Sequence, residues 1–396
     1  MAGRGRASRF SVVALVLLLV SLVACGGRPP AGGAEADLQR VLDRRSTAVL
    51  DRDRTAFLKT GAPGWFENLR GVPLASWSYR VTALRRTGDK ATADAELRYR
   101  IEGYDNAPVT VGRTLALSRE TGGRWYVDAD TPARKSAQQL WDQGPVTVVR
   151  GSHSIVLGTG QSSESLHSYA DLADRAVPAV SGAWGTDWAG HVVVLVPGSV
   201  EGMAGLLGSP ASQYRGIAAV TTGEVGGPPT APADRIIVNP DAYALLGPLG
   251  KQVVLTHEAT HVATRAHTNA ATPLWLSEGY ADWIGYLGTG RTAAEAAPEL
   301  SRAVTEGHVP QLLPTDKDFG FSGDATKLAQ AYEGGWMACR LIAQQWGLER
   351  LGQFYRAVGD HQQRAGSVEG AMRQVLGTTP EKFTVQWRDY LRAQLG

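Results

Sequence analysis

Residues 257–267 read HEATHVATRAH, and residues 275–283 read WLSEGYADW. Apolar residues on either side of the first histidine pair predict a buried helix that carries His257 and His261 four positions apart. At this spacing two side chains lie about 40° apart around the helix and about 6 Å apart along its axis, so both imidazoles can bind one metal ion. Glu258 diverges from His257 by about 100°, so we expect it beside the ion but not as a ligand.

His267 is one candidate for the third metal ligand. It falls six residues after His261, where the metzincin pattern HExxHxxGxxH places its last histidine. That pattern needs a glycine that breaks the helix, and Thr264 stands there instead. An unbroken helix turns His267 about 240° away from His261. Met337 lies in an apolar helical run and offers no Met-turn. We therefore expect His267 to be a surface histidine near a helix C-terminus, where the helix dipole favours it.

Glu278 is the candidate that the spacing favours. It lies in a second predicted helix that follows the loop 268–273 and can face the first helix. Asp282, four residues further on, shares its face and can accept the free ring N–H of a ligating histidine. Two imidazoles and one carboxylate form a three-ligand set that suits zinc. We predict one zinc ion per chain, bound by His257, His261 and Glu278.

With these two motifs the sequence resembles the gluzincin metallopeptidases, the thermolysin-like and M1-aminopeptidase-like group of the peptidase MA-like superfamily. The resemblance covers about residues 146–396 and implies that Glu258 is the general base of a peptide-bond hydrolase. The gap of 16 residues between His261 and Glu278 is shorter than in the best-known members. A GxMEN-type motif is also missing, so attack on free N-termini is not inferred.

The same resemblance extends to residues 331–358, which look like the helix that follows the active site in this group. There a tyrosine can stabilise the oxyanion, and Tyr332 stands at the matching place. A tyrosine buried for packing explains this position equally well. His308 lies in the polar stretch EGHVPQ, and we expect it to be an exposed loop histidine.

The N-terminus has the layout of an export signal. Three arginines precede the apolar run 10–24, which is short for a membrane span and leads directly into Cys25. The ending LVAC resembles the lipobox of bacterial lipoproteins, which implies lipidation of Cys25 and a place on the outer face of the cell membrane. A plain signal-anchor helix is the alternative. At least two acyl chains are needed for stable anchoring.

Three further segments follow the signal at residues 1–25. Residues 26–36 are rich in Gly, Pro and Ala and predict a flexible tether. Residues 37–145 predict a small α+β module that loosely resembles the NTF2-like or cystatin-like group, and we interpret it as a spacer or interaction module. Its expected elements are a helical region at 37–58 and strands at 77–84, 91–101, 109–118 and 124–130.

Residues 146–396 predict a gluzincin-like domain, a mixed sheet followed by a mostly helical half. Short apolar runs indicate strands at 146–151, 154–160, 191–198, 216–223 and 234–240, with a helix at 163–182. We expect residues 224–234 to form an exposed loop between two paired strands. The run RIIVNP is a candidate edge strand on which an extended substrate lies. The predicted fold class of the whole chain is α+β.

Composition narrows the choice of partners. The formal net charge is +2 and basic residues form only short pairs, so nucleic acid is an unexpected partner. Cys339 lies in an apolar helical context and is expected to be a small buried hydrophobe. With Cys25 lipidated, an intramolecular disulfide is excluded.

The function these patterns favour is a zinc-dependent peptidase held at the cell envelope by a lipid anchor, acting on a peptide or protein. A zinc-containing lipoprotein without catalytic activity, which binds protein or cell-wall partners, is the main alternative. The presence of Glu258 argues against it, because an inactive site needs no base. In a third possibility the N-terminal module binds a ligand and the zinc site only stabilises structure. The sequence leaves the substrate, endo- or exo-cleavage and the oligomeric state open.

Overall fold

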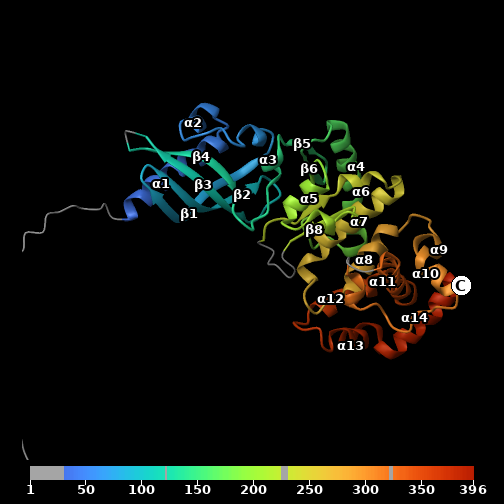
Figure 1. Ribbon diagram of the computed structural model, residues 1–396. Coiled ribbons are helices and arrows are strands. Elements are labelled where there is room, and N and C mark those ends of the chain that lie inside the picture. The colour runs from blue at the N-terminus through green and yellow to red at the C-terminus, as the bar shows by residue number, and fades with distance from the viewer. Residues whose placement is uncertain (1–30, 121–122, 224–230, 321–323) are drawn as a thin grey trace, which may run out of the picture.

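The chain folds into two β-sheets and a helical C-terminal half (Figure 1), in a computed structural model that describes residues 31–120, 123–223, 231–320 and 324–396. One sheet has four strands in the order β1-β2-β3-β4, and the other has five in the order β5-β6-β7-β9-β8. The predicted α+β class, with an N-terminal sheet and a mostly helical second half, is confirmed. Cys25 lies outside the described residues.

The first helical region differs from its prediction at both ends. Helix α1 spans Ala31–Leu50, so the last six residues of the predicted tether are helical. The chain then leaves the helix, with Arg52 in the left-handed region at φ 56°. A second short helix, α2 (Arg54–Leu58), begins after Asp53, whose carboxylate accepts the N–H of Ala56. This N-cap explains why the predicted continuous helix is divided in two.

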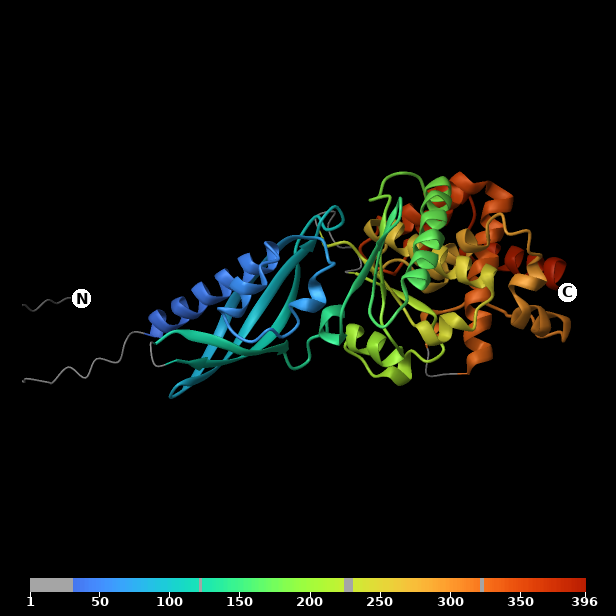
Figure 2. The same cartoon turned by 90° about the horizontal axis from the view of Figure 1, so that it is seen from above.

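The N-terminal sheet is an antiparallel meander covered by α1 (Figure 2). Its strands are β1 (Leu74–Thr87), β2 (Lys90–Ile101), β3 (Val109–Arg119) and β4 (Trp125–Pro132), at the predicted places. Buried and exposed residues alternate along β2, so one face of the sheet packs on the helices. A short helix, α3 (Leu140–Gln143), links this unit to the second sheet.

The second sheet is mixed, as predicted. Its strands are β5 (Thr147–Arg150), β6 (Ser154–Gly158), β7 (Val192–Val196), β8 (Ala219–Thr222) and β9 (Arg235–Val238). Strands β6, β7 and β9 are parallel, and β5 and β8 pair antiparallel at the two ends. Helix α4 (Ser163–Trp184) connects β6 to β7, and α5 (Val200–Leu207) follows β7.

The predicted edge strand is wrong. Strand β9, which contains the run RIIV, lies between β7 and β8 and is buried along its whole length. A continuous apolar run is typical of a strand covered on both faces. The strands at the two edges are β5 and β8, and β9 pairs with β7 on one side and with β8 on the other. Strand β8 therefore offers its outer side to a partner strand.

Both faces of the second sheet are covered. Ile236 and Val238 pack with the helical half, whereas Ile237 packs with the core of the N-terminal unit. A buried ion pair joins the two units: the guanidinium of Arg235 on β9 donates to both oxygens of Asp105, at 2.9 and 2.8 Å. The N-terminal unit is thus packed directly on the second sheet.

Helices form the rest of the chain, in agreement with the prediction. They are α6 (Pro240–Ala244), α7 (Pro248–Thr264), α8 (Leu274–Tyr286), α9 (Ala293–Ala296), α10 (Pro298–Thr305), α11 (Ala325–Trp346), α12 (Leu348–Gly359), α13 (Ser367–Ala371) and α14 (Pro380–Leu395). In the described part of the chain, none of the helices combines the length and the hydropathy that a membrane crossing requires.

Candidate metal centre

Helix α7 carries the first three residues of the site. Pro248 occupies its first turn, where a missing N–H costs nothing, and the helix ends at Thr264. Leu255 and Ala259 pack into the core on one side of the helix. His257 and His261 project together from the opposite side, and their rings lie 4.7 Å apart between centroids. Two imidazoles at this spacing on a rigid helix are held in place before any ion binds.

Helix α8 brings Glu278 to the two histidines because it crosses α11 at very short range. A Cβ atom added at Gly279 would lie 2.3 Å from the main chain of Gly335 on α11. A Cβ added at Gly335 would lie 2.6 Å from the carbonyl oxygen of Trp275. Only glycine allows this contact between two helix backbones. Glu278 directly precedes the crossing point, so its position depends on it.

The three predicted ligands converge on one point. Nε2 of His257 lies 3.0 Å from Nε2 of His261 and 3.3 Å from Oε2 of Glu278, and the third separation is 3.4 Å. In a tetrahedral zinc site with bonds of about 2.0–2.1 Å, neighbouring donor atoms lie about 3.3 Å apart. The three atoms therefore fit three corners of such a site, and their chemistry fits zinc as well.

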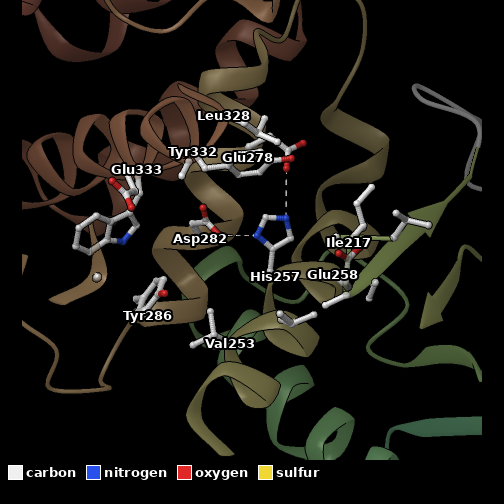
Figure 3. A pocket seen from close by; sticks show the side chains of 18 of the residues that line it. Ile217, Val253, His257, Glu258, Glu278, Asp282, Tyr286, Leu328, Tyr332 and Glu333 are labelled. Carbon is white, nitrogen blue, oxygen red and sulfur yellow. Dashed lines mark hydrogen bonds and ion pairs between the residues drawn. The ribbon is translucent and has the colours of Figure 1, made fainter. Parts of the chain in front are cut away.

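Asp282 orients the first histidine. Its Oδ1 lies 2.7 Å from Nδ1 of His257, so a neutral imidazole that donates this proton turns the lone pair of Nε2 toward the other two ligands. Figure 3 shows His257 between Asp282 and Glu278. Burial alone would lower the pKa of His257, but the Asp282 carboxylate outweighs it and holds this pKa well above the ordinary value.

Glu278 shows the complementary effect. Burial acts to raise the pKa of its carboxyl group, yet the imidazoles of His261 and His257 hold this pKa well below the ordinary range. The two shifts have complementary causes: the Asp282 carboxylate favours a protonated His257, and the imidazoles favour an ionised Glu278. The cluster therefore favours positive charge near its centre, which a bound cation would supply.

Glu258 lies next to this cluster without belonging to it. Its side chain points toward β8, where the hydroxyl of Thr221 lies 2.6 Å from Oε2. The residue is only 6% exposed, so the carboxylate is held in a largely desolvated place. Sequence analysis missed Thr221. A threonine on a short strand carries no distinctive signal, and its role depends on the pairing of β8 with β9.

A cavity of about 810 Å³ opens over the cluster. Its walls are strand β8 with the residues before it, helix α7, helix α8 and the first half of α11. Tyr332 of α11 lines it next to Glu278 (Figure 3). Burial, together with the carboxylates of Glu278 and Asp282, raises the pKa of Tyr332 above its ordinary value, so the phenol keeps its proton.

Glu333 also lines the cavity, and sequence analysis missed it as well. Its carboxylate accepts the N–H groups of Glu299 and Leu300 at the start of α10, at 3.2 and 2.5 Å. Burial raises the pKa of Glu333 to about 7. No periodic pattern relates Glu333 to α10, so only the folded chain reveals this contact.

The remaining candidates lie elsewhere. His267 sits in a 3-10 turn after α7, where its ring contacts that of Trp184 at 5.6 Å, so it is less exposed than predicted. Burial lowers the pKa of His267. The side chain of His308 is 77% exposed and is not among the residues that line the cavity. Cys339 is fully buried in α11, as predicted.

Comparisons with known proteins give similarity to solved structures alone. No protein-family model matches the chain, and no curated protein matches it. Among solved structures, the chain is similar to a two-domain M1 zinc metallopeptidase, crystallised as a glutamate-to-alanine mutant bound to L-arginine. The TM-score is 0.37 and the identity 10%, over 82% of this chain and 94% of that chain.

Proposed function

We propose that this chain is a zinc-dependent peptidase that hydrolyses peptide bonds with Glu258 as the general base. One observation carries the proposal: three metal-binding atoms converge at 3.0–3.4 Å, and a desolvated carboxylate that is not part of the set stands beside them in the same cavity. An ion-binding cluster that only stabilised the fold would not need that carboxylate or the open cavity.

His257, His261 and Glu278 would hold the zinc ion. When bound, the ion would supply Lewis acidity and would make a water molecule a stronger nucleophile near neutral pH. Asp282 fixes the ring of His257 in the orientation that this binding needs. The gluzincin assignment follows from the use of a glutamate from a second helix as the third ligand.

Glu258 moves the protons. It accepts a proton from the attacking water and delivers it to the departing amine, because a carboxylate beside the reacting atoms can serve as base and then as acid. Tyr332 lines the opposite side of the cavity and keeps its phenolic proton, which it can donate to the oxyanion that develops on the peptide carbonyl. The enzyme thus divides proton transfer and charge stabilisation between α7 and α11.

The substrate would bind as an extended strand on the outer edge of β8. Residues 216–221 line the cavity in an unbroken run, which places this strand edge directly beside the metal ligands. Main-chain pairing of this kind recognises the peptide backbone and is therefore tolerant of sequence. Apolar side chains on α7 and α11, such as Val253 and Leu328, would contact the substrate side chains.

We further propose that the peptidase acts at the cell envelope, held there by lipid on Cys25. The support is the export signal that ends in LVAC. Cell fractionation tests this: Cys25→Ser should leave the membrane fraction. A variant that stays bound after a carbonate wash would show that the segment is a true anchor helix.

The test of the peptidase itself compares Glu258→Gln with the wild type on a proteome-derived peptide library. Glutamine keeps the size of the side chain and can accept the Thr221 proton, so zinc content and folding should not change. Turnover should fall by about 10²–10⁴-fold, the usual contribution of general base catalysis. Glu295→Gln is the matched control, because Glu295 lines the same cavity but contacts Thr292 and Arg291.

Two outcomes would count against the proposal. If zinc-loaded Glu258→Gln cuts the same peptides as fast as the wild type, Glu258 is not the base and the mechanism is wrong. If the wild type cuts no peptide at all, the zinc-containing lipoprotein that binds partners without catalysis becomes the better description.

A further inference from the structure

Thr221 makes the closest contact with the proposed base. Its hydroxyl oxygen lies 2.6 Å from Oε2 of Glu258 and 3.0 Å from the main-chain oxygen of the same residue. A hydroxyl has one proton to donate, and the short contact to a carboxylate is the stronger of the two. Thr221 therefore donates to the Glu258 side chain.

This hydrogen bond determines which oxygen of Glu258 is available. The last torsion angle of a glutamate side chain is soft, so a carboxylate held only by its stem rotates readily. Among the described residues, no group donates a hydrogen bond to Oε1, whereas Oε2 is held by Thr221. The contact leaves Oε1 as the oxygen that is free to accept a proton.

The main chain of Thr221 faces the proposed substrate. Ala218 accepts a hydrogen bond from the N–H of Asn239 on the β9 side, and hydrogen-bonded pairs alternate along an antiparallel ladder. Val220 and Thr222 therefore bond to β9, and the N–H and C=O groups of Ala219 and Thr221 point to the outer edge of β8. Thr221 thus presents its main chain to the outer edge of β8 and its side chain to Glu258.

We propose that Thr221 is a positioning residue that fixes the Glu258 carboxylate relative to a peptide paired on β8. The proposal rests on the peptidase function argued above. The peptide would pair with the main chain of Thr221, and the side chain of the same residue donates a hydrogen bond to Glu258. Strand pairing would therefore set the distance between the scissile bond and Oε1 of Glu258. Loss of the hydroxyl should slow the chemical step and leave peptide binding to the β8 backbone intact.

The experiment uses Thr221→Val, which keeps a β-branched side chain suited to a strand and removes the hydroxyl. We expect kcat to fall about ten-fold or more, as for the loss of a hydrogen bond to a charged group, with KM and zinc content little changed. Thr221→Ser should recover most of kcat. Thr222→Val is the matched control one residue further on, because the Thr222 hydroxyl donates to the Arg235 main chain at 3.3 Å.

A second measurement does not depend on turnover. Calorimetric binding of a cleavable peptide to Glu258→Gln, with and without Thr221→Val, should give equal affinities. A loss of affinity in the double variant would show that Thr221 contributes to binding itself and would overturn the positioning role. If Thr221→Val does not fold, the comparison of Thr221→Ser with Thr221→Ala isolates the hydroxyl in the same way.

The two proposals fail in different ways. If Glu258→Gln lowers turnover and Thr221→Val equals the wild type in kcat, the positioning role is wrong and the peptidase mechanism stands. If no peptide is cleaved by the wild type, or if Glu258→Gln has no effect, the proposed function fails, and the inference about Thr221 fails with it.

Discussion

The Arg113 cluster of the N-terminal unit and the His257, His261 and Glu278 cluster of the helical half differ in how their charges are satisfied. In the N-terminal unit the guanidinium of Arg113 donates to Asp130 at 2.7 Å and to Asp142 at 2.9 Å. Tyr79 donates to the second oxygen of Asp130 at 2.5 Å. The side chains of Arg113 and Asp130 are each 1% exposed.

The cluster on α7 and α8 has the opposite arrangement. Nε2 of His257, Nε2 of His261 and Oε2 of Glu278 face one another instead of facing donors, and a cavity opens over them. In the Arg113 cluster every charge meets its opposite, so the cluster is complete without a ligand. Burial of charge therefore does not by itself mark a functional site. A functional site is marked by lone pairs that converge on one point beside an open cavity.

The largest effect should come from removing one of the three metal-binding side chains. Glu278→Ala removes one of three ligands, so the purified variant should lose most of its zinc. His267→Ala should keep about one zinc per chain, because its ring packs against Trp184 and not in the cluster. Metal analysis of the two proteins after dialysis makes the measurement. The reverse result would place His267 on the metal and remove the reason for the Asp282 contact.

Removing the cation of the Arg113 cluster should lower the stability of the fold and leave the zinc content unchanged. Arg113→Met leaves Asp130 and Asp142 buried without their cationic partner, and we expect the free energy of unfolding to fall by about 3–5 kcal/mol. Arg80→Met is the control on the same sheet: its pair with Glu96 is largely exposed, so about 1 kcal/mol or less is expected. Chemical denaturation gives both values. Zinc content should stay normal in both, and equal losses of stability would refute the distinction.

The smallest effect should come from weakening the metal cluster without removing a ligand. Asp282→Asn keeps an acceptor for Nδ1 of His257 but loses its charge, so zinc affinity should fall by about 10–100-fold. Competition with a chelator measures the affinity. Glu333→Gln neutralises another carboxylate of the same cavity that does not touch a ligand, and its effect should be clearly smaller. Equal effects would mean that Asp282 acts only through the general field of the cavity.

Much of the site was predictable because its spacing is local. The positions of His257, Glu258 and His261 on one helix, and of Glu278 and Asp282 on the next, follow from 3.6 residues per turn. Strands of the N-terminal sheet were also predictable, since alternation of apolar residues is a local pattern. The division of the first helical region at Arg52 was not, because a single N-cap decided it.

Other parts of the site depended on contacts between segments far apart in sequence. The run RIIV has the residues of a strand, but no residue in it tells whether the strand lies inside the sheet or at its edge. Nothing in the sequence around Gly279 and Gly335 shows that two helices cross at these residues. Likewise, nothing in the sequence around Thr221 shows that β8 lies beside α7.

By itself, then, the sequence determined the α+β class, the helix that presents two imidazoles, and the second helix that offers Glu278 and Asp282. Helical geometry is set by hydrogen bonds four residues apart, so it can be deduced from spacing alone. Only the tertiary structure decided that β8 is an edge strand, that α8 touches α11, and that Thr221 donates a hydrogen bond to Glu258. Strand order and helix crossings are selected by how apolar surfaces of the whole chain pack together, and that information is not local.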